Sequence, residues 1–327
     1  MCLWMKKGIF WMTLRYGKTL PTLQYLLNAG AKIILMSHLG DPHGAAPYLN
    51  LNRVKQKLED FGISLNKADD SIGSEVKEMV LHMKEGEILL LENLRFHKEE
   101  KENNPEFAKE LSGLGELFVN DAFAECHRAY ASITGIPKFL PSCQGLLLEK
   151  EISSLNRILT NPERPFVAIV GGAKAETKVK FIDKISEVAD TVIIAGFIQQ
   201  EAMEENIKFQ FSEKMISPVN APDNLDISAE TLQLFLPKIL EAKTILWNGP
   251  FGKIEDKAYR NGTLEIANAI VESGAFSVVG GGSTVEFLQE ESLMSKFSHV
   301  STGGGAMLEF LSGETLPGLK ALQENVL

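Results

Sequence analysis

The sequence is poor in cysteine, and the spacing of its three cysteines excludes two kinds of site. Cys2, Cys126 and Cys143 include no C-x-x-C pair, so neither a zinc site nor a dithiol redox site is predicted. Their odd number and wide spacing form no disulfide framework, which favours a reducing cytoplasm. Cys126 stands beside His127, but we interpret it as a structural thiol rather than a nucleophile.

The chain also lacks a long uninterrupted hydrophobic run and an excess of basic residues. Lys6 and Lys7 break the apolar N-terminal stretch, so neither a secretory signal nor a membrane-spanning helix is predicted. The formal net charge is -10 at pH 7, whereas proteins that bind nucleic acid usually present a basic face. We therefore expect neither a membrane nor a nucleic acid as partner, and any anion site must be a local cluster of cations.

No repeat or low-complexity tract stands out, and the composition is that of a globular enzyme. Hydrophobic residues make up 44% of the chain and charged residues 23%, which allows large buried cores. A chain of 327 residues exceeds one ordinary core and predicts two domains. Pro162 and Pro165 end a helical pattern that runs from Leu146 to Leu159, so we place the domain boundary between residues 160 and 161.

Short aliphatic and β-branched runs alternate with stretches in which apolar residues recur at helical spacing. Strands are predicted by seven such runs, at residues 31–36, 87–91, 117–119, 166–170, 191–194, 243–247 and 277–279. Alternating βα units predict an α/β fold with parallel sheets flanked by helices. Ligands of such sheets bind at the carboxyl ends of the strands.

Three glycine-rich junctions in the second half each follow a predicted strand and precede a helix-like segment. They are Gly171-Gly172-Ala173-Lys174, Gly280-Gly281-Gly282-Ser283-Thr284 and Ser301-Thr302-Gly303-Gly304-Gly305-Ala306. Glycine lets the backbone approach a ligand closely, and the N–H groups that begin the following helix can bind an anion. No junction matches G-x-G-x-x-G or G-x-x-x-x-G-K-[ST], so the predicted phosphate site is of another kind.

Positive charge in the first half follows the ends of predicted strands. His38 comes after the first strand, Arg95 after the second and Arg128 after the third, with Arg15 upstream. The planar fork of arginine matches phosphate and carboxylate oxygens, so these residues predict an anion pocket at one rim of the sheet. The alternative is that each arginine is a surface residue paired with a nearby glutamate. No spacing of histidines and carboxylates predicts a metal site.

Ordered blocks along nearly the whole chain resemble the phosphoglycerate kinase family. The blocks are Leu20-Pro21-Thr22 and residues 35–40, 91–97, 119–123, 127–128, 171–174, 247–250 and 299–306. The resemblance implies two Rossmann-like lobes joined by a hinge. Residues 1–160 would form the lobe for 3-phosphoglycerate and residues 161–312 the lobe for the nucleotide, while residues 313–327 would return to the first lobe.

The same resemblance implies an activity and its ligands. The reaction would be reversible phosphoryl transfer between ATP and the carboxylate of 3-phosphoglycerate, in glycolysis or gluconeogenesis, and closure of the lobes would bring the two ligands together. Mg²⁺ would be carried with ATP or ADP, and the acyl phosphate product would be 1,3-bisphosphoglycerate. The resemblance further implies a monomeric cytoplasmic enzyme.

Individual residues receive roles from the resemblance alone. The transferring phosphoryl group would be contacted by Arg15, Lys178, Gly303 and Gly304. The phosphoglycerate would be bound by Arg15, His38, Leu39, Gly40, Asp41, Arg95 and Arg128. The nucleotide would be bound by Gly171, Gly172, Lys174, Lys178, Asn248, Glu255, Gly280, Gly281, Gly282, Ser283 and Thr284.

Departures from the family pattern leave an alternative open. Residues 1–13 contain no Asp-Phe-Asn-type motif, Asp41 stands where the family usually has arginine, and Ser283 stands where it usually has aspartate. The chain is also shortened between Gly196 and Asp226. The alternative function is a noncatalytic phosphoglycerate kinase-like binding protein. A Rossmann dehydrogenase is disfavoured because the G-x-G-x-x-G fingerprint is missing.

Overall fold

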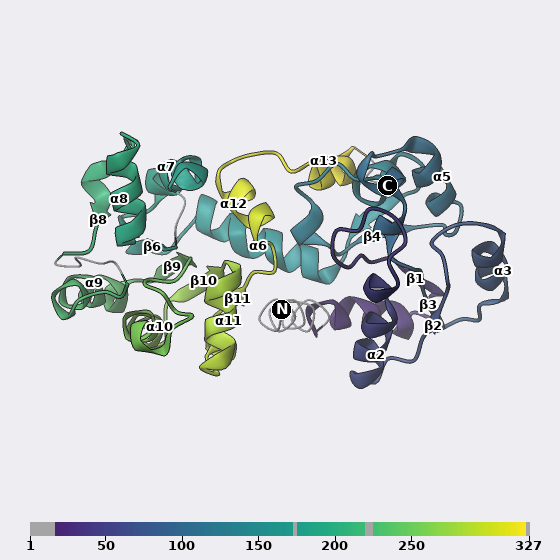
Figure 1. The fold of residues 1–327 in the computed structure, drawn as a ribbon, viewed down its shortest axis with the longest axis horizontal. Coiled ribbons are helices and arrows are strands. Elements are labelled where there is room, and N and C mark those ends of the chain that lie inside the picture. Colours follow the sequence, from purple (N-terminus) through teal and green to yellow (C-terminus); the bar gives the residue numbers. More distant parts are fainter. Residues whose placement is uncertain (1–16, 173–174, 220–224, 325–327) are drawn as a thin grey trace. The chain divides into compact units, whose positions relative to one another are not determined.

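Parallel sheets flanked by helices form both units of the computed structural model (Figure 1). The structure describes residues 17–172, 175–219 and 225–324, so Arg15 and Lys174 lie outside the described residues. The first unit contains the described residues up to Lys150 and those from Thr315 onward, and the second contains Glu151–Glu314. All strand pairs among the described residues are parallel, as the alternating pattern predicts.

Short strands in the first unit form two sheets. A three-stranded sheet has the order β1-β3-β2, and β4 pairs with β5 in a separate two-stranded sheet. The strands are β1 (Ile33–Leu35), β2 (Asn66–Lys67), β3 (Ile88–Leu90), β4 (Phe118–Asn120) and β5 (Ser142–Gln144). Because β1, β3 and β4 end just before the segments with His38, Arg95 and Arg128, these basic residues all lie at carboxyl ends of strands.

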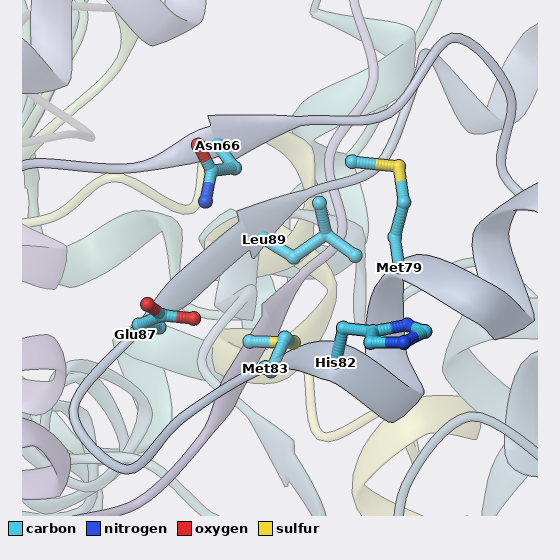
Figure 2. A pocket seen from close by; sticks show the side chains of 6 residues that line it. All are labelled: Asn66, Met79, His82, Met83, Glu87 and Leu89. Carbon is cyan, nitrogen blue, oxygen red and sulfur yellow. The ribbon is translucent and has the colours of Figure 1, made fainter.

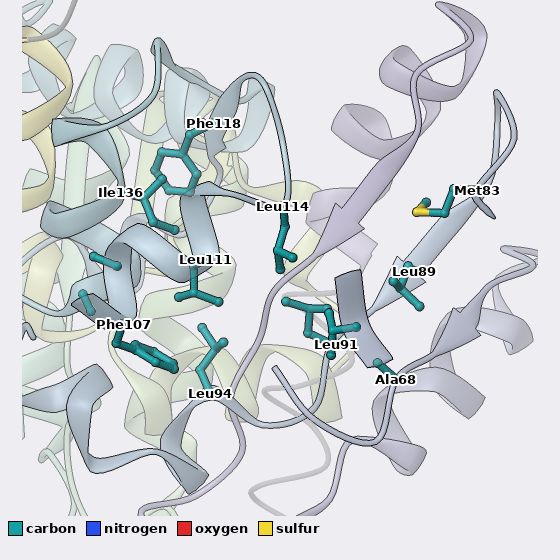
Figure 3. Close-up of a cluster of buried hydrophobic side chains, with 13 residues drawn as sticks. Ala68, Met83, Leu89, Leu91, Leu94, Phe107, Leu111, Leu114, Phe118 and Ile136 are labelled. Carbon is teal, nitrogen blue, oxygen red and sulfur yellow. The ribbon is translucent and has the colours of Figure 1, made fainter. Parts of the chain in front are cut away.

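Helices and short turns cover these sheets. Residues 17–28 are helical, and they are followed by α2 (Asn52–Asp60), α3 (Ser74–His82), α4 (Lys98–Lys101), α5 (Pro105–Ser112) and, from the end of the chain, α13 (Pro317–Gln323). The short 3-10 turns are η1 (Pro47–Leu49), η2 (Leu94–Phe96), η3 (Phe123–Glu125) and η5 (Ile136–Lys138), and η4 (Ala131–Gly135) is a π-helical turn. Figure 3 shows a buried hydrophobic cluster in which Leu91, which follows β3, and Phe118 of β4 belong to the same core. One hydrophobic core therefore supports both sheets.

A six-stranded sheet with the order β11-β10-β9-β6-β7-β8 forms the centre of the second unit. Its strands are β6 (Phe166–Val170), β7 (Thr191–Ile194), β8 (Met215–Ile216), β9 (Thr244–Asn248), β10 (Phe276–Gly280) and β11 (His299–Val300). Every residue of β6 and β9 is buried, as expected for parallel strands covered on both faces. The chain leaves β6 toward β7 and later returns to the other side at β9, so the switch of strand order lies between β6 and β9.

A helix follows each strand of this sheet, and all of these helices except the last lie in connections between strands (Figure 1). They are α7 (Val179–Val188), α8 (Gly196–Glu204), α9 (Ala229–Glu241), α10 (Asn261–Ser273), α11 (Gly282–Glu290) and α12 (Gly305–Leu311). Short turns are η6 (Glu176–Lys178), η7 (Ser212–Lys214), η8 (Lys257–Tyr259) and η9 (Met294–Lys296).

Helix α6 (Leu146–Thr160) contains the boundary between the two units, which falls after Lys150. In the first unit, the Asp121 carboxylate accepts hydrogen bonds from the backbone N–H groups of Leu147 and Leu148 at 2.9 and 3.1 Å. In the second, the Arg157 guanidinium lies 3.9 Å from the centre of the Phe276 ring. The sequence predicts the boundary at residues 160 and 161, where prolines follow this same helix, whereas the two compact units of the structure divide within the helix.

Candidate functional site

Three basic residues from separate strand ends of the first unit meet at one carboxylate. The Arg95 Nη2 lies 3.0 Å from Glu125 Oε2, the His38 Nε2 lies 3.3 Å from Glu125 Oε1, and the Arg128 Nε lies 3.5 Å from Glu125 Oε2. Glu125 is buried, with 8% of its surface exposed. The sequence predicts the convergence of the three cations but misses the carboxylate that joins them. We call these four residues the basic cluster.

A network of backbone acceptors holds the basic cluster in place. Asn93 donates from its side-chain amide to the carbonyls of Leu39 and Leu49 at 2.8 and 2.9 Å, which fixes the loop after β1 against η2. Arg95 donates from Nη1 to the Gly40 carbonyl at 2.8 Å. Gly40 has a φ of +66°, and an added Cβ would lie 3.0 Å from the Leu49 side chain, so this loop conformation favours glycine.

The charges of the cluster stabilise the ionised form of Glu125. Burial alone raises the pKa of that carboxyl, but the hydrogen bond from His38 and the charges of His38, Arg95 and Arg128 lower its pKa to about 2. Because this value is below the usual 4.5, the ionised group stabilises the fold above pH 4.5, and that stabilisation is lost as pH falls toward 2. The carboxylate is thus charged throughout the physiological range.

Asp41 lies at the exposed rim of the cluster rather than inside it. Its carboxylate forms an ion pair with Lys101 of α4, and this hydrogen bond lowers the pKa of Asp41. The charges of Arg95 and His43 act in the same direction. The charge of Asp41 is therefore balanced by Lys101 and not by the basic cluster alone. Sequence patterns do not reveal Lys101 as a neighbour of the site.

The predicted glycine loop after β6 meets the loop after β9 at the switch point of the second unit. Gly171 follows β6, and its N–H donates to the Asn248 carbonyl at the end of β9 at 2.8 Å. The Gly172 N–H donates to the Pro250 carbonyl, also at 2.8 Å. A Cβ on Gly171 would collide with the Gly249 carbonyl oxygen, and a Cβ on Gly249 would collide with that of Gly171. Glycine is therefore required at both positions for the loops to cross this closely.

Lys178 at the end of η6 points its ammonium group back into these loops. Its Nζ donates to the Gly171 carbonyl at 2.6 Å, and only 9% of the residue is exposed. Burial lowers the pKa of Lys178 to about 8, while the charge of Glu201 opposes this shift. A cation that is partly desolvated beside a backbone loop suits an anionic phosphate.

The third loop, residues 280–284, joins the same edge through a threonine. Strand β10 ends at Gly280, and α11 begins at Gly282, so Ser283 and Thr284 lie in the first turn of that helix. Thr284 accepts at Oγ1 a hydrogen bond of 3.1 Å from the Gly249 N–H. Glycine loops from three strands thus come together, and the helix N–H groups favour an anion there.

A buried glutamate organises the loop that follows β11. Glu151 of α6 is fully buried and accepts from the Thr302 N–H at 2.6 Å, the Thr302 hydroxyl at 2.8 Å and His299 Nε2 at 2.8 Å. Burial raises the pKa of Glu151, but the bond and charge of His299 and the Thr302 donors outweigh it and lower this pKa. The loop that carries Gly303 and Gly304 is therefore fixed by one carboxylate, and neither Glu151 nor His299 received a role from the sequence.

The remaining predicted residues take different positions. Glu255 is exposed in the segment between β9 and η8. Cys126 is buried, and burial raises the pKa of its thiol to about 12, which supports a structural interpretation.

Other features of the described residues do not form a second site. Figure 2 shows a pocket between α3 and the edge of the β2 and β3 strands, lined by Met79, His82, Met83 and their neighbours, none of which was predicted to bind a ligand. Among the described residues, no group of three or more His, Cys, Asp or Glu side chains could hold a metal ion. The search of these same residues also finds no helix long and apolar enough to cross a membrane.

Comparison with known proteins assigns this architecture. The sequence model of the phosphoglycerate kinase family matches residues 5–214 and 199–314. The chain belongs to the phosphoglycerate kinase family. A phosphoglycerate kinase of Dictyoglomus turgidum is 40% identical over 367 aligned residues, which cover 98% of this chain and 93% of the relative. One of Gloeobacter violaceus is 39% identical, with 95% and 90% covered.

Solved phosphoglycerate kinases share the fold. The structure from Pyrococcus horikoshii has a TM-score of 0.84 and 30% identity, covering 95% of this chain and 91% of that one. The structure from Coxiella burnetii has a TM-score of 0.80 and 30% identity, with 94% and 90% covered. These similarities confirm the predicted family, the two-domain α/β fold and the predicted enzyme class, an ATP-dependent kinase with a carboxylate acceptor.

The alignments also show that this family member is short. The alignment with the Dictyoglomus turgidum relative spans 367 residues, more than the 327 of this chain, so the relative contains segments that this chain lacks. The family match is divided in two near residues 199–214, within the region where the sequence indicates a shortening.

Proposed function

We propose that the first unit binds 3-phosphoglycerate and the second binds ATP or ADP, and that the chain transfers a phosphoryl group reversibly between ATP and the substrate carboxylate. The observation that carries this proposal is the presence of two anion sites of different chemistry, at carboxyl ends of parallel strands, in a chain of this family. Acyl phosphate formation needs no covalent help from the protein. It needs two bound ligands in line and neutralised negative charge.

In the first unit, the acid would be bound by the basic cluster. Arg95 and Arg128 offer paired N–H donors to phosphate or carboxylate oxygens, and His38 offers a single ring nitrogen. The backbone of Leu39 and Gly40, which Asn93 and Arg95 hold in place, would line the same rim. Asp41 would be a rim residue whose charge is balanced by Lys101.

In the second unit, the nucleotide phosphates would bind over the crossed glycine loops. Residues 280–284 supply backbone N–H groups at the start of α11. Gly171 and Gly172 would let the phosphates approach closely, while their own N–H groups stay bonded to the Asn248 and Pro250 carbonyls. Lys178 supplies a cation that can exchange the Gly171 carbonyl for phosphate oxygens. Asn248 lies between the loops, and Glu255 is proposed for the nucleotide ribose. Mg²⁺ would enter as part of the nucleotide substrate, with the Ser283 hydroxyl as a weak oxygen partner.

Charge that develops on the transferring group would be stabilised by preorganised donors. Gly303 and Gly304 would provide backbone N–H groups, that of Gly303 by leaving the Ser301 hydroxyl to which it donates at 3.1 Å. Glu151 fixes the preceding residue, Thr302, through its amide and hydroxyl. Arg15 and Lys174 keep their proposed roles as phosphoryl and nucleotide contacts, although both lie outside the described residues. A monomeric state and a cytoplasmic location stay predictions.

The test is coupled turnover of the purified, folded protein with MgATP and 3-phosphoglycerate. We expect measurable formation of the acyl phosphate, and we expect Arg15→Ala to reduce turnover by at least about a hundredfold, since a transition-state arginine contributes on this scale. Nucleotide affinity should change little. Arg53→Ala, an exposed position on α2, is the matched control. A folded protein that binds both ligands without turnover would instead support the noncatalytic alternative.

A further inference from the structure

The basic cluster contains its own anion. Each of the three described side chains that we propose for 3-phosphoglycerate is already paired with Glu125, at 3.0 Å for Arg95, 3.3 Å for His38 and 3.5 Å for Arg128. Tyr130 adds to this arrangement, because its hydroxyl accepts from Arg128 Nη1 at 2.7 Å and its ring faces both guanidinium groups at 5.5 Å. An incoming anion therefore meets cations that already form ion pairs with Glu125.

The main chain at Glu125 is held beside the three cations by backbone hydrogen bonds of a short turn. Glu125 ends the tight turn η3, whose residues Phe123 and Ala124 are buried. The Glu125 N–H donates to the Ala122 carbonyl at 2.9 Å, and the Glu125 carbonyl accepts from the Arg128 N–H at 2.9 Å. The turn thus fixes the main chain of Glu125 and of Arg128, one of its cations, in a single short segment.

The position of this carboxylate differs from that of Asp41. Asp41 is exposed at the rim and paired with Lys101, which is not one of the three proposed substrate cations. Glu125 is buried and contacts all three of them. Two carboxylates thus lie near a site for an anion, but only Glu125 competes for the same donors.

We infer that Glu125 is an internal competitor for the acidic substrate, so that 3-phosphoglycerate binds by exchanging places with the Glu125 carboxylate on Arg95, Arg128 and His38. This inference rests on the proposed function of the first unit. Glu125 thereby sets the affinity for the substrate. Binding of the acid costs the free energy of separating the ion pairs of Glu125, and the bound acid then lies close to a negative charge. Removal of that charge strengthens binding, whereas a carboxylate that merely orients the arginines would have the opposite effect when removed.

The experiment measures the dissociation constant of 3-phosphoglycerate by calorimetry for the wild-type chain and Glu125→Gln. We expect the variant to bind about tenfold more tightly or better, because a charged hydrogen-bond partner no longer has to be displaced. Glu125→Asp retains the charge and should not bind more tightly. Glu116→Gln makes the same charge change at an exposed position before β4, at the opposite end of that strand, and should leave the affinity unchanged.

Equal or weaker binding by folded Glu125→Gln would overturn the inference and assign Glu125 an orienting role. Thermal melting establishes folding of each variant, and Glu125→Ser is the second neutral variant if Glu125→Gln does not fold. Wild-type turnover, measured in parallel, separates this inference from the proposed function. Turnover without tighter binding by the neutral variants overturns the competitor role alone, whereas tighter binding without turnover supports the competitor role and overturns only the catalytic proposal.

Discussion

The two units present positive charge to an anion by different means. In the first, Arg95, Arg128 and His38 share the buried carboxylate of Glu125, so affinity depends on a balance among full charges. In the second, glycine-rich loops lie beside one lysine, Lys178, which donates to the neutral Gly171 carbonyl. The comparison teaches that a single charge change should alter anion affinity strongly at the first site. At the second site, anion affinity should depend on main-chain geometry and on the protonation of Lys178.

The largest expected effect follows from Arg95→Met, which removes a cation but keeps a long side chain. Arg95 is buried and donates both to Gly40 and to Glu125. Breaking a buried pair costs roughly 3–5 kcal/mol, since the remaining charge stays buried. We expect a fall of about 3 kcal/mol in the free energy of unfolding, from urea denaturation, and a loss of about a hundredfold in 3-phosphoglycerate affinity.

Nucleotide affinity of Arg95→Met should stay at the wild-type value. If the double variant with Glu125→Gln does not recover part of the lost stability, the two side chains are not energetically coupled, and the contrast between the two sites fails at its strongest point.

The second unit should respond to pH through Lys178. Its pKa is about 8 in the folded chain against 10.5 when unperturbed, so between these values the folded state binds fewer protons. The free energy of unfolding therefore rises with pH in this window and gains nothing from this group below it. Since phosphate binds the ammonium form, we expect ADP affinity to fall about fivefold between pH 8 and pH 9, as titration of one group with this pKa gives.

Lys178→Met should remove this pH dependence. Lys180→Met is the matched control, because Lys180 is an exposed neighbour on α7 paired with Glu314. Calorimetric titrations with ADP at several pH values measure the slope, and the same slope in Lys178→Met would assign it to another group.

The smallest effect is expected at the rim of the first unit. Asp41→Arg replaces an exposed carboxylate by a cation and leaves Lys101 without its partner. Both changes favour an acidic substrate, but exposed charges are screened, so we expect a gain of about two- to fivefold in 3-phosphoglycerate affinity at low salt. The gain should shrink when the calorimetry is repeated at high salt. Weaker binding by this variant would remove Asp41 as a determinant of affinity.

Sequence patterns predict the parts of this molecule that depend on local chemistry. Aliphatic runs give the buried strands β6 and β9, and glycine junctions give the loops at their ends. Strands β2 and β8 contain two residues each, too few for a periodic pattern, and they form because neighbouring strands offer hydrogen bonds.

The sequence predicts the basic side chains and glycine loops of the two sites but not the carboxylates that contact them. Arginines after strand ends predict an anion pocket. The competing interpretation, surface arginines paired with a nearby glutamate, fits the contact of Arg128 with Glu125 but not that of the buried Arg95. Glu151 and His299 are 148 positions apart, and their bond follows from tertiary packing that no local spacing encodes. The long-range carboxylates are thus what sequence analysis misses at both sites.

Where the loops cross at Gly171 and Gly249, the path of the main chain at the proposed nucleotide edge depends on the two glycines and not on the side chains around them. Each glycine leaves room for the main chain of the other, so neither can be exchanged alone without moving a strand end. Side chains around the crossing can change, and catalytic speed with them, while the main-chain cradle persists. A family member can therefore lose or regain turnover through a few side-chain changes, as long as Gly171 and Gly249 stay glycines. Their hydrogen atoms, in place of methyl groups, keep the crossing of the two loops intact.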